Sequence, residues 1–271
     1  MALITLTTDW RKSDYYIGAI KGKILSHDAS TVVVDINHLV APYNMMQAAF
    51  ILRNCFHYFP SGTVHIVGVN PVLSRKNSLL ILEKEGHFFL SSDTGFPGLI
   101  FPEQNVKVYR LNLSKTPVHS LESLDFFVET AFRLITGEAP ADFAEETSKY
   151  VLQLPLKPVI DNNLINGNVV YIDSYSNAIT NITRETFNRV GNGMDFKIYV
   201  QSNHYVIDKI SHSYQEVASG ELLALFNSAD VLEIAISNAP AAELLNLDVN
   251  STIRVKFAHA NQSNKLLLSG E

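Results

Sequence analysis

Three β-rich runs separated by helical patterns open the chain and constrain its fold more than any other feature. The runs are ALITLTT (2–8), STVVVDI (30–36) and GTVHIVGV (62–69), and the last two are almost continuous β-branched stretches, typical of strands buried on both faces. Between them, residues 15–27 and 44–59 carry apolar side chains at helical spacing. This alternation of strands and helices predicts an α/β domain with a mostly parallel sheet and right-handed crossovers.

The rest of the chain predicts a hairpin, one more strand and helix, and then a second domain. SLLILEKEGHFFLSS (78–92) predicts a hairpin that turns at EKEG, because two alternating runs flank a Gly-containing turn. After two prolines and several Asn residues, mainly short strand patterns follow, which predicts a small all-β barrel. The predicted organisation is an α/β domain over 1–153, a linker over 154–166, a β-barrel over 167–258 and a polar tail over 259–271.

Composition and charge limit the kinds of partner and the location expected for this chain. The 271 residues are 46% hydrophobic, with 21 Lys and Arg against 27 Asp and Glu, which allows two packed domains and gives a net charge of −6. Without a basic run to follow a phosphate backbone, nucleic acid is not expected as a partner. Neither a membrane-spanning stretch nor a secretory signal pattern is found, so a cytoplasmic location is expected. His38 and His65 lack a second ligand at metal-binding spacing, and no metal is expected.

Polar segments follow the predicted strands at the positions where an open α/β sheet binds its ligand. These segments are rich in Asp, Asn, Ser or Thr and cover residues 7–16, 37–44, 70–77 and 91–95. The chain has no phosphate-binding glycine loop, no GxSxG and no HExxH. Since a carboxylate can accept hydrogen bonds from neighbouring ribose hydroxyls, a nucleoside is the ligand that this composition favours.

Six blocks in order resemble the S-adenosylmethionine hydroxide adenosyltransferases, relatives of the fluorinating and chlorinating enzymes that use the same substrate. The blocks are TLTTDWRKSDYYIGAIKGKIL, VVVDINHLVAPYNMMQAAFIL, YFPSGTVHIVGVNP, SSDTGFPGLI, YIDSYSNAITNI and FNSADVLEIAISNAPAAELL. The resemblance covers roughly residues 3 to 257. It implies an N-terminal α/β domain, a C-terminal β-barrel and a homotrimer whose sites lie between subunits. No cofactor is implied, because S-adenosylmethionine (SAM) is itself the substrate or ligand.

In the first domain the resemblance assigns substrate contacts to four residues. Asp9 matches the aspartate that holds the ribose hydroxyls, and Tyr43 matches an aromatic position beside the ribose and sulfonium. Asp14 falls where the family binds the methionine amino group, with Tyr16 close by. The sequence context alone favours Asp14 as an N-cap of the helix that follows.

In the second domain the resemblance implies a methionine- and adenine-binding block, made of Asp173, Tyr175 and Asn177. Tyr214 aligns with a second stacking aromatic, and Ser228 aligns with a serine that contacts the methionine carboxylate. The arginine next to that serine in the halogenases is Ala229 here. Without the resemblance, these tyrosines would be ordinary half-buried aromatics and Asn177 a turn residue.

The matched blocks depart from the family where water is activated. The hydrolases place an Asp and an Arg in an Asp-Pro-Gly-Val-Gly loop and its continuation, whereas this chain reads NPVLSRKNS, with Asn70 at the Asp position. Asn cannot accept a proton, so this replacement changes the chemistry of the position. Arg75 or Lys76 is the candidate for the cation.

A second departure lies in the block that carries a histidine in the hydrolases. Glu122 stands at the histidine position and is a candidate base, and His119 is three residues earlier. Ser123 matches a serine of the fluorinating branch. The long insertion of the fluorinating enzymes is replaced by a tight hairpin, so halide transfer is not expected.

Two hypotheses follow. The first is a hydrolase that converts SAM and water to adenosine and L-methionine by attack at the ribose C5′, with Asn70, Arg75 and Glu122 in the catalytic positions. The second is a degenerate member that binds adenosine or SAM without turnover.

Overall fold

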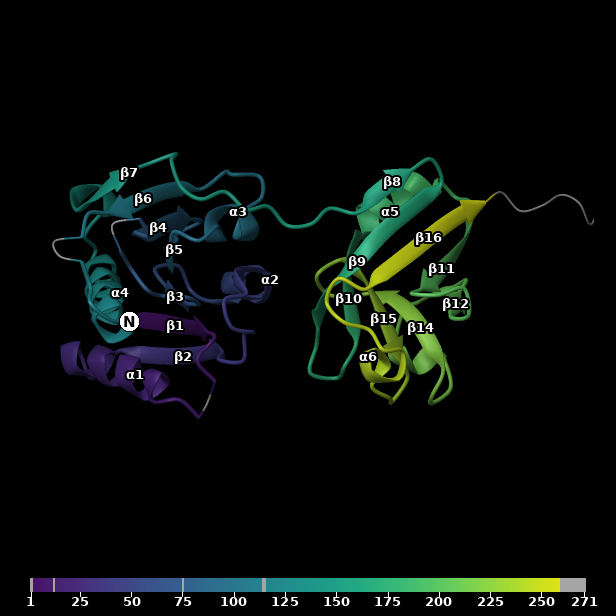
Figure 1. Ribbon diagram of the computed structural model, residues 1–271, viewed down its shortest axis with the longest axis horizontal. Coiled ribbons are helices and arrows are strands. Elements are labelled where there is room, and N and C mark those ends of the chain that lie inside the picture. Colours follow the sequence, from purple (N-terminus) through teal and green to yellow (C-terminus); the bar gives the residue numbers. More distant parts are fainter. Residues whose placement is uncertain (1, 12, 75, 114–115, 259–271) are drawn as a thin grey trace, which may run out of the picture. The chain divides into compact units, whose positions relative to one another are not determined.

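The computed structural model describes residues 2–11, 13–74, 76–113 and 116–258 and divides into two compact units (Figure 1). The first unit is Met1–Pro155 and the second is Leu156–Glu271. Within the described residues, no helix combines the length and the apolar character needed to cross a membrane.

The N-terminal unit is built on a seven-stranded sheet with the order β2-β1-β3-β5-β4-β6-β7. Its strands are β1 (Leu3–Thr8), β2 (Val32–Asn37), β3 (Val64–Gly68), β4 (Leu79–Lys84), β5 (His87–Ser92), β6 (Lys107–Leu111) and β7 (Ala144–Glu146). The pairs β1–β2, β1–β3 and β3–β5 are parallel, whereas β4–β5, β4–β6 and β6–β7 are antiparallel. The α/β class is confirmed, but the prediction of a mostly parallel sheet is wrong because the sheet is mixed.

The predicted hairpin explains why parallel pairing stops in the middle of the sheet. Lys84 pairs with His87, and the two residues between them, Glu85 and Gly86, both have positive φ, 52° and 77°. A two-residue turn of this kind joins antiparallel strands only. Once β4 runs against β5, no crossover helix is needed to add β6 and β7.

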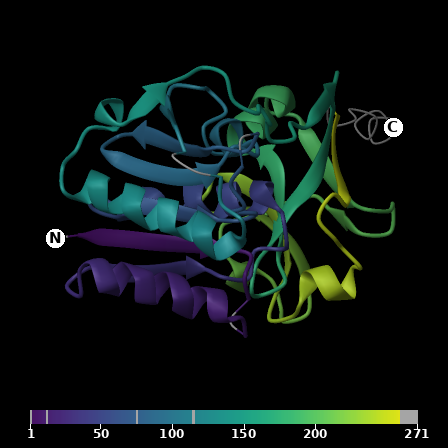
Figure 2. The same cartoon turned by 60° about the vertical axis from the view of Figure 1, so that its left-hand side comes forward.

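Helices cover both faces of this sheet (Figure 2). On one face lie α1 (Tyr15–His27) and α4 (Ser120–Ile135), which pack on Ile4, Leu6 and Ile66. The other face carries α2 (Met45–Arg53), η1 (Phe56–Tyr58) and α3 (Phe96–Ile100). The short η2 (Pro140–Asp142) precedes β7. Coverage of both faces leaves every residue of β1 and β3 buried, whereas β2, expected to be buried on both faces, is the edge strand and is partly exposed.

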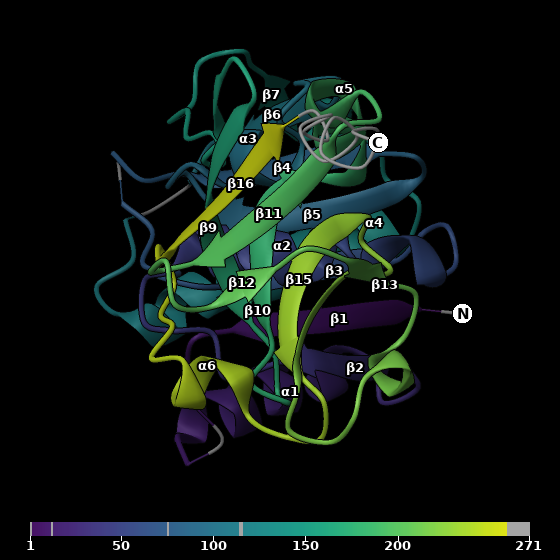
Figure 3. The ribbon, with the colours of Figure 1, turned by 90° about the vertical axis from the view of Figure 1, so that its right-hand side faces the viewer.

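The C-terminal unit is a nearly closed, barrel-like sheet with the order β12-β11-β16-β9-β10-β15-β14-β13 (Figure 3). Its strands are β8 (Val159–Asp161), β9 (Leu164–Ile172), β10 (Ala178–Thr183), β11 (Asp195–Val200), β12 (Val206–Ile207), β13 (Ile210–Ser211), β14 (Leu222–Phe226), β15 (Val231–Ile236) and β16 (Thr252–Ala258). Its helices are α5 (Arg184–Gly191), η3 (Tyr214–Glu216) and α6 (Ala241–Leu244). Alternate side chains of β9, β11 and β16 point into one apolar core.

Two parts of this unit differ from the sequence prediction. The segment 154–166, expected to be a linker, includes β8 and the first residues of β9, which pair as a hairpin through a turn where Asn162 has a φ of 48°. The helix α5 lies where only strands were expected, and Thr183 caps it by accepting the N–H of Thr186 at 3.1 Å. The predicted polar tail, 259–271, lies outside the described residues.

Candidate functional site

The loops after β1, β2 and β3 meet at the carboxyl edge of the sheet. Asp9 follows β1, which lies between the other two strands. Its Oδ2 accepts the backbone N–H of Tyr43, from the loop after β2, at 3.0 Å, and that of Asn70, from the loop after β3, at 3.4 Å. A single carboxylate oxygen therefore holds both neighbouring loops, in the place where an open α/β sheet binds ligands.

Both residues that donate to Asp9 have left-handed backbone conformations. The φ of Tyr43 is 64° and that of Asn70 is 45°. The first is unusual for a bulky aromatic residue and has to be held by its surroundings. Asn70 is also held from the other side, because the buried Ser92 hydroxyl donates to the Asn70 carbonyl at 3.0 Å.

A hollow of about 210 Å³, here called the N-terminal hollow, opens beside Asp9. It brings together five of the predicted site residues: Asp9, Asp14, Tyr16, Tyr43 and Asn70. Trp10, which the sequence analysis did not select, forms part of the wall, is only 7% exposed and lies 6.0 Å from the Tyr16 ring between centroids. The exposed Tyr43 side chain stands at the rim.

Asp14 occupies the N-cap position of α1, but its side chain makes no capping hydrogen bond. The backbone conformation of an N-cap is thus present without the interaction that would explain an aspartate there. Its place in the wall of the N-terminal hollow agrees with the ligand-binding alternative.

The loop that carries Asp9 is supported by His38. The ring Nδ1 of this buried histidine lies 2.8 Å from the Thr8 Oγ1, and its Nε2 lies 3.1 Å from an oxygen of Asp35. Its backbone carbonyl accepts the N–H of Arg11. His38 therefore holds residues on both sides of Asp9.

The beginning of α4 contains the predicted residues Glu122 and Ser123. His119 is the N-cap of this helix and accepts the Glu122 N–H, while the Glu122 carboxylate accepts the N–H of Val118 at 2.6 Å. This is a variant of the capping box. Ser123 is fully buried, and its hydroxyl accepts the N–H of Leu73 at 3.0 Å.

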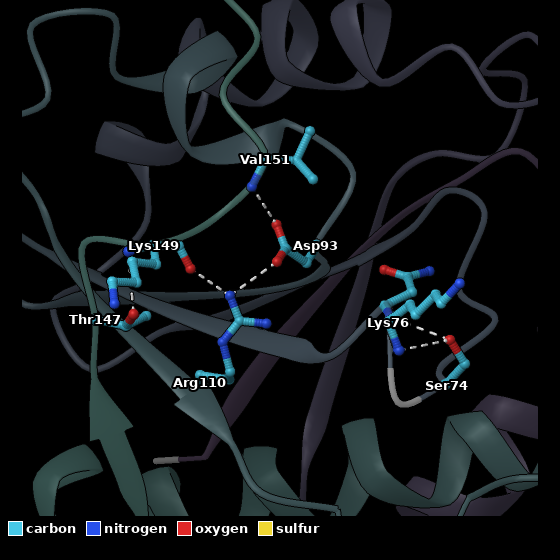
Figure 4. A network of polar contacts seen from close by, with 8 residues as sticks. Ser74, Lys76, Asp93, Arg110, Thr147, Lys149 and Val151 are labelled. Carbon is cyan, nitrogen blue, oxygen red and sulfur yellow. Dashed lines mark hydrogen bonds and ion pairs between the residues drawn. The ribbon is translucent and has the colours of Figure 1, made fainter.

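Neither Glu122 nor Ser123 is among the described wall residues of the N-terminal hollow, to which α4 contributes Leu124. Of the two candidate cations, Arg75 lies outside the described residues. The backbone N–H of the other candidate, Lys76, donates to the Ser74 hydroxyl at 3.2 Å (Figure 4).

An ion pair lies near the end of β5 (Figure 4). The Asp93 carboxylate, 5% exposed, accepts from Arg110 at 3.0 Å and from the N–H of Val151 at 2.7 Å. Arg110 also donates to the Lys149 carbonyl. Asp93 thus fixes the segment that leaves β7, although its position at a strand end had made it part of the predicted ligand-binding edge.

In the C-terminal unit, the turn between β9 and β10 contains the predicted block. Asp173 Oδ1 accepts the backbone N–H groups of Tyr175 at 2.9 Å and Asn177 at 2.8 Å, and its Oδ2 lies 3.2 Å from the Asn177 amide nitrogen. Asn177 is buried, whereas the Tyr175 side chain is 79% exposed. The turn is rigid at its base and presents an aromatic ring at its tip.

A second hollow, of about 880 Å³ and here called the C-terminal hollow, surrounds this turn. Asp173, Tyr175, Asn177 and Tyr214 all line it, which brings together four of the five residues predicted in this unit. The fifth, Ser228, is exposed in the turn between β14 and β15 and is not part of the described wall. Glu243 of α6 is an additional wall residue and accepts from the Ser176 hydroxyl at 3.1 Å.

The Tyr214 hydroxyl is held by Glu233, a residue that the sequence did not point to. The hydroxyl donates to Glu233 at 2.6 Å. Burial, together with the nearby Glu233 carboxylate, raises the pKa of Tyr214 well above its usual range. The available signal was a single glutamate inside the apolar run VLEIAI.

The fold and these hollows define a protein with an α/β domain and a small, barrel-like β domain, each with a hollow lined by carboxylates and aromatic rings. The chain belongs to the S-adenosylmethionine hydroxide adenosyltransferase family. The model of the family's N-terminal domain matches residues 4–144, and that of its C-terminal domain matches residues 167–254. The predicted family is confirmed.

Individual relatives span nearly the whole chain. The (R)-S-adenosyl-L-methionine hydrolase of Methanocaldococcus jannaschii is 27% identical over 273 residues, covering 94% of this chain and 96% of its own. The hydrolase of the same name from Thermus thermophilus is 24% identical and covers 94% and 100%. An uncharacterized conserved protein from Thermotoga maritima has the same fold, with a TM-score of 0.82 at 24% identity over 94% of this chain and 99% of that one.

Proposed function

We propose that this protein hydrolyses S-adenosyl-L-methionine to adenosine and L-methionine. Water attacks the ribose C5′, the bond from C5′ to the sulfonium sulfur breaks, methionine leaves as a neutral thioether, and one proton is released. The names of the full-length relatives support this proposal. Methionine is a good leaving group from a sulfonium, so positioning of the water and removal of its proton supply the catalysis and no cofactor is needed.

The observation that carries the proposal is the geometry at Asp9. One oxygen of its carboxylate is occupied by two backbone N–H groups, and the residue lines the N-terminal hollow. The second oxygen then accepts from the ribose hydroxyls, as the family resemblance implies. Tyr43, at the rim, faces the sulfonium with an aromatic surface, which suits a cation.

We further propose that the protein is a homotrimer in the cytoplasm, with the N-terminal hollow of one subunit completed by the C-terminal hollow of another. Each hollow contains part of the predicted ligand contacts: the ribose and amino-group residues in one, and the aromatic residues for adenine in the other. Exposed apolar side chains near the first hollow, Tyr15, Leu39 and Val72, support a subunit contact there.

Glu122 is our candidate for the base that takes the proton of the attacking water. It stands at the position of the family histidine and directly precedes Ser123 and Leu124, which link α4 to the loop at Leu73 and to the hollow. Asn70 orients the water through its side-chain amide, and Arg75 supplies a positive charge.

One observation favours the second hypothesis, a protein that binds SAM or adenosine without turnover. The Glu122 carboxylate already accepts the Val118 N–H at 2.6 Å, as a helix-capping residue does. A glutamate that serves only this role would leave the water without a base.

Glu122→Gln separates the two hypotheses, because the glutamine oxygen can still accept the Val118 N–H but cannot act as a base at neutral pH. Purified protein is incubated with SAM, adenosine is measured by chromatography, and adenosine binding is measured by calorimetry. We expect adenosine formation by the wild type, a loss of roughly 100-fold or more in kcat for the variant, and unchanged adenosine affinity. Wild-type binding without product would establish the second hypothesis, and an active variant would remove Glu122 from the catalytic set.

A further inference from the structure

A carboxyl group inside the C-terminal unit has no role in the function proposed above. Glu233 lies on β15 and is 2% exposed. Its partners across the sheet are Ile179 on β10 and Leu225 on β14, both apolar. A carboxyl group in such surroundings loses its hydration and is retained only when other groups replace the lost hydrogen bonds.

Two neutral side chains replace those hydrogen bonds. Glu233 Oε1 accepts the Tyr214 hydroxyl at 2.6 Å, and Oε2 accepts the Asn227 amide at 3.0 Å. Both carboxyl oxygens are therefore satisfied by side chains. An apolar pair of similar shape would avoid the cost of desolvating a carboxyl group and its donors, so stabilising the sheet does not by itself explain a glutamate here.

Both partners lead to the ligand-binding surface. Tyr214 lines the C-terminal hollow and is 43% exposed. Asn227 opens the turn between β14 and β15, where its side-chain oxygen accepts the N–H of Ala229 at 3.0 Å and so fixes the backbone around Ser228. Glu233 is therefore the common anchor of a predicted stacking ring and of the predicted carboxylate-binding turn.

We propose that Glu233 is a positioning residue of the ligand site, which orients the Tyr214 ring for stacking on adenine and holds the turn that presents Ser228. This inference rests on the proposed function, because the ligand is the one assigned there. Glu233 contacts no reacting atom in this scheme, so its loss weakens binding rather than the chemical step. The phenol hydrogen bond sets the plane of the ring, which an apolar contact alone would leave free to tilt.

The test compares Glu233→Leu, which removes both acceptors, with Glu233→Gln, whose amide oxygen can still accept from Tyr214. Adenosine and SAM affinities are measured by calorimetry, and KM and kcat by adenosine release. We expect Glu233→Leu to weaken adenosine binding and raise KM about tenfold or more while kcat changes by less than about twofold, and Glu233→Gln to restore the part of the affinity that depends on the Tyr214 hydrogen bond, since its amide nitrogen no longer accepts from Asn227. Glu185→Gln, an exposed glutamate on α5, is the matched control and should behave as the wild type.

Tyr214→Phe keeps the test decisive if Glu233→Leu fails to fold, since it removes only the hydroxyl and leaves the ring in place. We expect it to weaken adenosine binding in the same direction, and the double variant with Glu233→Leu to lose less than the sum of the two losses. Unchanged binding in either folded single variant, additive losses, or a fall in kcat without a rise in KM would overturn the positioning role. A wild type that binds neither ligand would overturn the proposed function and this inference together, whereas binding that is insensitive to both variants overturns this inference alone.

Discussion

Replacing Asp9 by Asn separates the proposed ligand-binding role of this carboxylate from its role in the fold. Asn and Asp have the same shape, so the Asn amide oxygen can take the place of Oδ2 and accept the N–H groups of Tyr43 and Asn70. The opposite orientation would set an amide donor against two backbone donors and is disfavoured. The amide nitrogen then stands where the second oxygen of Asp9 accepts from the ribose.

The structure gives the size of the expected effect. The two loops stay in place in Asp9→Asn, so the change is the loss of charge-assisted hydrogen bonds to the ribose. Hydrogen bonds to charged groups contribute about 1.5–3 kcal/mol, which corresponds to a roughly 10- to 150-fold weaker affinity for adenosine and for SAM. The melting temperature should stay close to that of the wild type, because the two N–H groups keep their acceptor.

Calorimetry with adenosine measures this affinity, and thermal unfolding measures stability. Asp9→Ala is the contrasting variant: it also leaves the N–H groups of Tyr43 and Asn70 without their acceptor, so it should lower both affinity and melting temperature. Wild-type affinity in a folded Asp9→Asn variant would refute the assignment of Asp9 as a ribose ligand. A large loss of stability in Asp9→Asn would instead refute the separation of the two oxygens.

Two further predictions concern stability. Burial lowers the pKa of His65 to about 3, so below pH 6.5 the unfolded chain takes up a proton that the native state does not. The free energy of unfolding should therefore fall by up to ~1.4 kcal/mol per pH unit between about pH 6.5 and 3. His65→Gln should reduce this loss of stability at acid pH, as measured by denaturant titrations. Arg110→Leu leaves the buried Asp93 carboxylate without its cation and should cost about 3 kcal/mol, much of which Asp93→Asn in the same chain should restore; an unchanged denaturation midpoint in Arg110→Leu would show that the pair contributes nothing.

Local sequence patterns predicted the strands and the hairpin of the N-terminal unit. They did not predict the order of the strands in the sheet, which depends on pairing between residues far apart in the sequence. The apolar runs at 30–36 and 62–69 and the EKEG turn all form the expected strands and hairpin. The order of strands was harder, because a hairpin can enter a sheet at an edge or inside it, and here it lies between β3 and β6. The helix α5 escaped prediction because it is only eight residues long and mostly polar, so its Thr183 cap was its clearest signal.

The candidate site also has features that the sequence predicted and features that it did not. The rule that loops after parallel strands converge at one edge predicted that Asp9, Tyr43 and Asn70 would lie together, and they do. What a side chain does within such a loop depends on partners far away in sequence. Ser123 is fully buried, and its hydroxyl accepts the backbone N–H of Leu73, fifty residues earlier in the chain. A resemblance between short blocks cannot show such a contact.

The two aspartates that anchor the hollows differ in how much of each carboxylate remains for a ligand. A carboxylate has about four acceptor positions. Asp173 accepts two backbone N–H groups and the Asn177 amide within its own turn, so three of these positions are already filled. Asp9 fills two, both on one oxygen, with backbone groups from two separate loops. Asp173 therefore acts mainly by shaping the turn that presents Tyr175, whereas Asp9 supports its loops with one oxygen and, in the proposed function, accepts from the ribose with the other.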